Sequence, residues 1–223
     1  MHLNIRRADI NELIRPGTMS TIIGKRGTGK SFLIRDILLT LRHIPRGIVF
    51  SGTERLKSYY KHFLPDTPIY YTVDPATIDE ILEEQANIIR EAGGTSPDNE
   101  MFLVFDDSLT FDMGFAKKIF PLACALNITS FVLQQDALAL KPNVRAYVDN
   151  VFLFSENIRS NVNKLWKFYG NVFPDQESFS KVFDLCTSRY ECMVINRKPD
   201  ATQKIEDKVF YYRAKEHPMS EAQ

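Results

Sequence analysis

One stretch, GKRGTGKS at residues 24–31, constrains the fold of this chain more than any other. It matches the spacing G-x-x-x-x-G-K-[S/T], in which backbone N–H groups surround phosphate oxygens. An apolar run precedes it, and residues 30–43 carry apolar side chains at a helical period. Strand, loop and helix in this order predict a phosphate-binding loop whose helix points its N-terminal N–H groups at an anion. The alternative is a glycine turn with Lys30 in solvent, and the flanking strand and helix disfavour it.

The rest of the chain alternates short apolar runs with longer amphipathic ones, which predicts an α/β fold with a mainly parallel sheet flanked by helices. Expected strands lie at 19–24, 46–52, 68–73 (an edge strand), 101–108, 127–135 and 151–156, and a C-terminal antiparallel pair is expected at 190–196 and 208–214. Expected helices lie at 30–43, 55–63, 74–94, 115–126, 141–150, 160–173 and 175–186, and Pro121 should kink or break the fourth.

Length and composition indicate a globular protein, because 223 residues with 44% hydrophobic and 25% charged content can bury a core. We expect one domain over residues 1–215 and a flexible tail over 216–223. The formal net charge is zero, so nucleic acid would have to be bound by local patches. The candidate basic pairs are Lys117 with Lys118, Lys164 with Lys167, and Arg197 with Lys198.

Three cysteines without a C-x-x-C pair, and scattered histidines, disfavour a disulfide framework and a structural zinc site. No apolar run reaches the length that spans a bilayer, and the N-terminal residues lack the apolar core of a signal peptide. We therefore expect a soluble intracellular protein without a membrane span.

Polar residues follow several predicted strands, at the sheet edge where ligands of open α/β sheets bind. In the loop, Lys30 would reach the β- and γ-phosphates and the Ser31 hydroxyl would hold Mg²⁺. At the end of the fourth expected strand, after the apolar residues 102–105, Asp106 would act on the metal side, and the adjacent Asp107 would orient and polarise an attacking water. For Asp107 the alternative is a helix cap.

For a glutamine pair and an arginine, the position in the sequence does not decide between a functional and a structural role. Gln134 and Gln135 end a predicted strand, where an amide can sense a γ-phosphate or position water, although glutamine is also common there without a function. Arg145 could stabilise transition-state charge in a neighbouring subunit, whereas by default a helical arginine only faces solvent.

The chain resembles the genome-packaging ATPases of large double-stranded DNA viruses, the poxvirus-type packaging enzymes related to the FtsK and HerA translocases, and above all those of giant viruses. The resemblance covers residues 19–214, and the segments that carry it are IIGKRGTGKS, FLVFDD, KPNVRAYVDNVFLF, YGNVFPD, YECMVIN and VFYYRA. It implies a RecA/ASCE-like P-loop NTPase fold, ATP and Mg²⁺ as cofactors, and hydrolysis coupled to packaging of double-stranded DNA. It also implies a homo-oligomeric ring, a pentamer or hexamer, a capsid, portal or membrane-associated virion partner, and a location in the host cytoplasm, the viral factory or the virion.

Matched residue by residue, the resemblance assigns roles to the residues named above. Asp106 becomes the Walker B acid, which binds the metal together with Ser31, and Asp107 becomes the catalytic base. Lys30 is then the catalytic lysine and Gln135 the sensor. Arg145 becomes the arginine finger that acts in trans. The expected nucleotide-binding residues are Gly24, Lys25, Arg26, Gly27, Thr28, Gly29, Lys30, Ser31 and Phe32. The spacing from Gln135 to Pro142 departs by one residue from the family's usual pattern, which leaves Gln134 as the alternative sensor.

A small-molecule phosphotransferase such as a nucleotide kinase shares the loop and fold class and is the alternative function, with Arg46, Arg55 and Lys57 as its candidate basic lid. A GTP switch is disfavoured because the guanine-reading N-K-x-D is absent; NKLW at Asn163 lacks the final acid.

Overall fold

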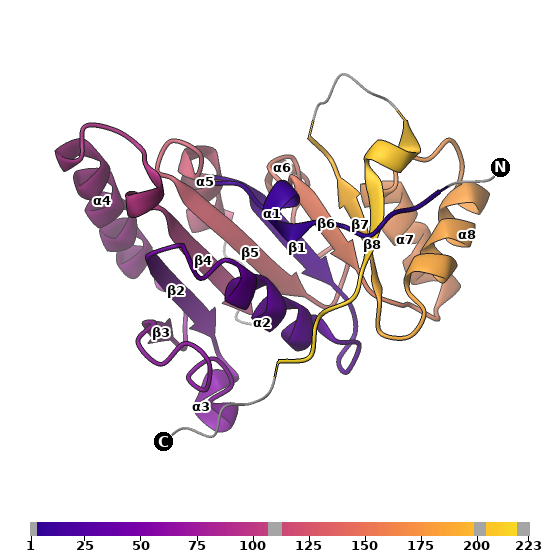
Figure 1. Cartoon of the computed structure of the whole chain (residues 1–223), viewed down its shortest axis with the longest axis horizontal. Coiled ribbons are helices and arrows are strands. Elements are labelled where there is room, and N and C mark those ends of the chain that lie inside the picture. Colours follow the sequence, from indigo (N-terminus) through magenta and orange to yellow (C-terminus); the bar gives the residue numbers. More distant parts are fainter. Residues whose placement is uncertain (1–3, 107–112, 199–203, 218–223) are drawn as a thin grey trace.

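The computed structural model describes residues 4–106, 113–198 and 204–217 (Figure 1). Within these residues eight strands form one sheet in the order β3-β2-β4-β5-β1-β6-β7-β8. Their bounds are β1 Met19–Ile23, β2 Arg46–Ser51, β3 Ile69–Tyr70, β4 Met101–Asp106, β5 Ile128–Gln134, β6 Asn150–Leu153, β7 Cys192–Asn196 and β8 Val209–Tyr212. Strands β1 to β6 pair in parallel, whereas β7 and β8 add an antiparallel pair at one edge. The expected fold class, including the C-terminal pair, is confirmed.

Helices cover both faces of this sheet (Figure 1). They are α1 Ile10–Leu13, α2 Lys30–Thr40, α3 Glu54–Lys57, α4 Pro75–Glu91, α5 Met113–Leu122, α6 Pro142–Arg145, α7 Arg159–Tyr169 and α8 Gln176–Cys186, with 3₁₀ turns at Pro97–Asn99 and Ile205–Asp207. The apolar faces of α1 and α2 pack on one side of the sheet, and those of α4 to α8 pack on the other. The central strands are therefore buried on both faces, as continuous apolar runs require.

The sheet brings the ends of distant strands together. β1 lies between β5 and β6, and the register places Ile23 beside Gln134 and Asp106 beside Leu133. The loop after β1, the end of β4 and the end of β5 consequently meet at one edge, which is the ligand-binding edge of open α/β sheets.

Several expected helices are shorter in the structure, and the one expected at 141–150 spans only Pro142–Arg145. The helix predicted at 55–63 ends at Lys57, because Ser58 adopts a left-handed φ of 47° and the buried Glu54 carboxylate accepts hydrogen bonds from the N–H groups of Tyr60 and Lys61. The helix containing Pro121 ends at Leu122, one residue after the proline, whose ring cannot continue the hydrogen-bond ladder. Among the described residues, no helix is long and apolar enough to cross a membrane.

Candidate functional site

The loop between β1 and α2, residues 24–31, is called the glycine loop below. Gly27 and Gly29 have φ values of 82° and 113°, a region that side-chain-bearing residues seldom occupy. The Lys30 Nζ donates to the carbonyl oxygens of Gly24 at 2.6 Å and Lys25 at 3.1 Å, so the loop curves around its own lysine. The helix that starts at Lys30 directs its first N–H groups into this curve.

Gly24 sits where the loop packs against the neighbouring strand. A Cβ atom there would lie 2.6 Å from Thr28 Oγ1 and 2.7 Å from Phe154 Cβ, so only glycine fits. The Thr28 hydroxyl donates to the Lys25 carbonyl at 2.8 Å. Thr28 thus acts within the loop and stabilises its turn.

Lys25 ties the glycine loop to the segment after β6. Its Nζ lies 2.6 Å from Glu156 Oε1, and Glu156 also accepts from the N–H of Ile158 and from Asn161. Burial acts to raise the pKa of Glu156, but these hydrogen bonds outweigh it and hold the pKa below its usual value. Lys25 therefore forms an ion pair that holds the glycine loop against this segment, and its contact with nucleotide stays a prediction.

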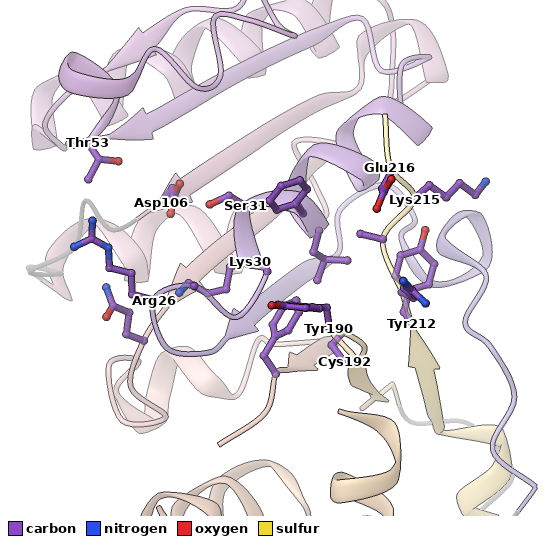
Figure 2. Close-up of a pocket in the computed structure, with 18 of the residues that line it drawn as sticks. Arg26, Lys30, Ser31, Thr53, Asp106, Tyr190, Cys192, Tyr212, Lys215 and Glu216 are labelled. Atoms are coloured by element: carbon purple, nitrogen blue, oxygen red, sulfur yellow. The ribbon is translucent and has the colours of Figure 1, made fainter. Parts of the chain in front are cut away.

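One cavity of about 810 Å³ opens beside the glycine loop (Figure 2). Among the expected nucleotide-binding residues, its lining includes Arg26, Gly27, Gly29, Lys30, Ser31 and Phe32. Asp106 and Gln135 also line it, as do residues that the spacing did not suggest: Thr53, Leu56, Lys57, Tyr190, Cys192 and residues 212–216. Cationic side chains outnumber acidic ones in this lining, which suits a polyphosphate.

Asp106 reaches the cavity from the end of β4 and is held there by a tyrosine. The Tyr60 hydroxyl, fully buried, donates to Asp106 Oδ2 at 2.8 Å. Burial and the neighbouring Asp106 charge raise the pKa of Tyr60 well above its usual value, so the phenol stays protonated and can donate. The adjacent Tyr59 donates to the Ser31 carbonyl at 2.8 Å. This tyrosine pair therefore connects the segment after α3 to both candidate metal-side residues.

The donor set at this point fits a divalent cation of the magnesium type. The Ser31 hydroxyl and the Asp106 carboxylate are hard oxygen ligands that line the same cavity as the glycine loop. No cluster of three or more histidine, cysteine, aspartate or glutamate side chains able to hold a metal occurs in the described parts of the chain. Mg²⁺ commonly combines one or two protein carboxylate ligands with substrate phosphates and water. Asp107, the expected base, lies outside the described residues.

The two glutamines at the end of β5 point in opposite directions. Gln134 is buried, and its Nε2 donates to Thr21 Oγ1 at 3.0 Å and to the Tyr169 hydroxyl at 3.5 Å. Gln135 is exposed and lines the cavity. Of the two candidates, Gln135 is the one that lines the cavity.

Arg145 does not line the cavity of its own chain. Its Nη1 donates to the Leu140 carbonyl at 2.8 Å, and its guanidinium carbon lies 4.3 Å from the centre of the Phe168 ring. The Arg145 side chain is half-buried between α6 and α7, where its contact with Phe168 stabilises the packing of the two helices.

Some of the candidate basic pairs have partners within the chain. Lys118 pairs with Asp79 at 2.7 Å on the surface. Arg197 donates to the carbonyl oxygens of Arg145 and Val148, and burial lowers its pKa. The Arg197 side chain thus binds the segment from the end of α6 to the start of β6.

The residues that sequence reasoning missed come from two places. Tyr59 and Tyr60 lay within an expected helix. Tyr190 lies in the turn before β7, and residues 212–216 are the last residue of β8 and the segment after it. No spacing rule connects these positions to a loop at 24–31. The single available signal was the polar or aromatic character of residues at strand ends.

Comparisons with known proteins were made by sequence and by structure. No family model matches the chain. Protein L437 of Acanthamoeba polyphaga mimivirus is 34% identical over 223 residues, covering 95% of this chain and 78% of L437. Protein 015R of Frog virus 3 is 33% identical over 203 residues, covering 89% of this chain and 62% of that protein.

The fold is also found in a solved structure, that of B204, the DNA-packaging ATPase from Sulfolobus turreted icosahedral virus. The two structures superpose with a TM-score of 0.64 over 90% of this chain and 99% of B204, at 16% identity. At that identity the likeness concerns the fold. The sequence match to L437, by contrast, spans most of both chains at 34% identity. The chain therefore belongs to the protein family that includes L437 of Acanthamoeba polyphaga mimivirus.

Proposed function

We propose that the chain is an ATP hydrolase that uses Mg²⁺. The observation that carries this proposal is the convergence of Lys30, Ser31, Asp106 and Gln135 on one cavity beside a glycine loop. Binding without hydrolysis would need the loop alone, whereas an acid and an amide at the adjacent strand ends are the parts that handle metal and water.

Each residue has a distinct part in this reaction. The N–H groups of the glycine loop and the Lys30 ammonium bind and orient the phosphates and neutralise their charge. Ser31 and Asp106 would hold Mg²⁺, which when bound stabilises the charge of the phosphate oxygens. Gln135 would position the attacking water and Asp107 would accept its proton, a role for Asp107 that rests on its place next to Asp106.

We further propose that hydrolysis drives packaging of double-stranded DNA by a homo-oligomeric ring, with a capsid or portal protein as partner. Three observations support this: the sequence resemblance, the membership in a family with viral members, and the fold shared with B204. In such a ring Arg145 would serve the cavity of the neighbouring subunit. This requires its contacts with Leu140 and Phe168 to present the guanidinium at the subunit boundary or to release it.

The kinase alternative is less well supported by the geometry. Arg46, one of its three candidate lid residues, is the first residue of β2 and thus lies at the sheet edge opposite the glycine loop. There it pairs with Glu84 at 2.5 Å and donates to Gln85 at 3.0 Å. Arg55 stacks on Tyr71 at 4.7 Å, and of the three residues Lys57 alone lines the cavity.

The decisive experiment measures phosphate release by the full chain with Mg²⁺ and ATP, alone, with double-stranded DNA and with a panel of nucleosides and nucleotides. We expect hydrolysis that DNA stimulates and that Lys30→Ala reduces roughly 100-fold, the scale of losing one preorganised charge. Transfer of phosphate to a nucleoside or nucleotide, without stimulation by DNA, would favour the kinase. Absence of hydrolysis under every condition would refute the proposal.

Whether Arg145 acts in trans can be tested by mixing two inactive variants. Lys30→Ala has a disabled cavity and an intact arginine, whereas Arg145→Ala has the reverse. If the arginine acts across a subunit boundary, the mixture regains part of the activity that each variant lacks. Arg42→Ala, a substitution of an exposed arginine, serves as the control. Full activity of Arg145→Ala by itself would remove the finger role.

A further inference from the structure

The cavity continues well past the glycine loop. Figure 2 shows Lys30 and Ser31 between two groups of side chains. On one side lie Arg26, Thr53 and Asp106, where the proposed hydrolysis takes place. On the other lie Tyr190, Tyr212 and residues 215 and 216, which that reaction does not use. The second group forms a separate half of the same cavity, here called the distal half.

Exposed aromatic side chains line the distal half. Phe32, the residue after the glycine loop, is 61% exposed, and Tyr190 is 75% exposed. Tyr190 and the preceding Arg189 have left-handed φ values of 64° and 54°, which residues with bulky side chains seldom adopt. A strained turn that holds an aromatic ring in solvent at the wall of a cavity is typical of a ligand contact.

A second wall of the distal half is formed by residues 213–216, which together with His217 are called the C-terminal segment below. A buried carboxylate holds this segment in place. Asp36 of α2 has a fully buried side chain. Its Oδ2 accepts from the Tyr212 hydroxyl at 2.8 Å and from the Lys215 N–H at 2.9 Å, and its Oδ1 pairs with His217 Nε2 at 2.7 Å. A buried charge is costly unless hydrogen-bonded, and here the partners are Tyr212, Lys215 and His217, from the last residues that the structure describes.

Asp36 also fixes the C-terminal segment relative to the glycine loop. It lies on the same helix whose N-terminus forms the end of the glycine loop, less than two turns further along. The C-terminal segment is therefore attached to the element that would bind the phosphates. A ligand seated on the glycine loop and leaving it past Phe32 would meet this segment.

We propose that Tyr190 and the C-terminal segment bind the base and ribose of the nucleotide whose phosphates lie on the glycine loop, with Asp36 and His217 as positioning residues; this inference rests on the proposed function. An aromatic ring supplies a stacking surface for any base. The Glu216 carboxylate, which lines the distal half, is an acceptor suited to ribose hydroxyls.

The test compares two ligands that share the phosphates and differ in the nucleoside. Binding of Mg·ATP and of Mg·tripolyphosphate to the full chain is measured by titration calorimetry for the native protein, Tyr190→Ala and His217→Ala. We expect Tyr190→Ala to weaken ATP binding about tenfold, as the loss of one base-stacking contact of about 1.4 kcal/mol would do. We expect tripolyphosphate to bind native protein and variants alike.

A control and a rescue separate positioning from general damage. Tyr147→Ala removes another exposed tyrosine, which precedes β6 at the opposite sheet edge, and should change neither affinity. His217→Gln retains a hydrogen-bond donor toward Asp36 and should restore the ATP affinity lost in His217→Ala. In addition, ATP but not tripolyphosphate should protect the bonds after Arg213 and Lys215 from trypsin.

The outcomes distinguish this inference from the function on which it rests. If the native protein binds neither ligand, the proposed function is wrong and the nucleoside site with it. If it binds both, yet Tyr190→Ala and His217→Ala bind ATP as tightly as the native protein, only the nucleoside site is wrong. Equal loss of ATP and tripolyphosphate in these variants would likewise overturn it, because the residues would then act on the loop.

Discussion

The hydrogen bond from Tyr60 to Asp106 can be tested by a single substitution, because one oxygen atom can be removed without changing the packing of the ring. Tyr60→Phe deletes a buried donor 2.8 Å from a carboxylate. Hydrogen bonds to charged groups contribute about 1.5–3 kcal/mol, so we expect that loss in the free energy of unfolding. For a chain of this size the melting temperature should fall by about 3–12 °C.

The assay is urea unfolding followed by circular dichroism, with Tyr59→Phe as the matched control. Tyr59 donates at the same 2.8 Å distance, but to the neutral Ser31 carbonyl and from a less buried position, so its removal should cost only about 0.5–1.5 kcal/mol. A free energy of unfolding for Tyr60→Phe within about 0.5 kcal/mol of the native value would refute the bond, since that is the range of ordinary surface substitutions.

The same tyrosines make stability depend on alkaline pH. Burial, and then the Asp106 charge, raises the pKa of Tyr60 above the usual 10.0, and burial raises the pKa of Tyr59 to about 12. Above about pH 10 the unfolded chain loses phenolic protons that the folded chain keeps. The unfolded state then binds fewer protons, so stability is full below that pH and falls as pH rises. The fall should be less steep in Tyr60→Phe, and equal slopes from about pH 9 to 11 would contradict the assignment.

Other predictions concern packing and the glycine loop. Gly47→Ala places a Cβ 1.9 Å from the Phe102 ring and should lower the free energy of unfolding by about 1–3 kcal/mol; an unchanged value would contradict this packing. Lys25→Ala breaks the partly exposed pair with Glu156, so stability should change by less than about 1 kcal/mol while calorimetry shows a several-fold loss of ATP affinity; unchanged affinity would remove the positioning role. Gly24→Ala should abolish ATP binding but preserve the circular dichroism spectrum, because its Cβ meets the loop itself; binding at native affinity would refute this.

Much of the fold was predictable from the sequence because its signals are local. The glycine spacing at 24–31 requires a strand before it and a helix after it, and both are present as β1 and α2. Continuous apolar runs indicated central parallel strands, and their polar ends pointed to one sheet edge. Asp106 at the cavity follows from this logic. Gln134 ends β5 and Gln135 follows it, and only the packing around the strand end decides which of the two reaches the cavity.

The failures occurred where a distant contact overrides a local preference. Residues 55–63 have a helical pattern, yet the chain leaves the helix at Ser58 so that Glu54 and Tyr60 can make buried hydrogen bonds. The finger role of Arg145 stays a prediction; its contacts with Leu140 and Phe168 are ones that no spacing rule contains.

The sequence by itself thus determined a strand, a glycine loop and a helix, and the carboxylate at a neighbouring strand end, because neighbours along the chain suffice for each. The tertiary structure decided what surrounds them. Three contacts join residues that are far apart in the sequence. Tyr60 binds Asp106 across 46 positions, Lys25 binds Glu156 across 131, and Asp36 binds the C-terminal segment across up to 181. Such contacts depend on the order of strands in the sheet and on which helix covers which face, and those are properties of the packed chain as a whole.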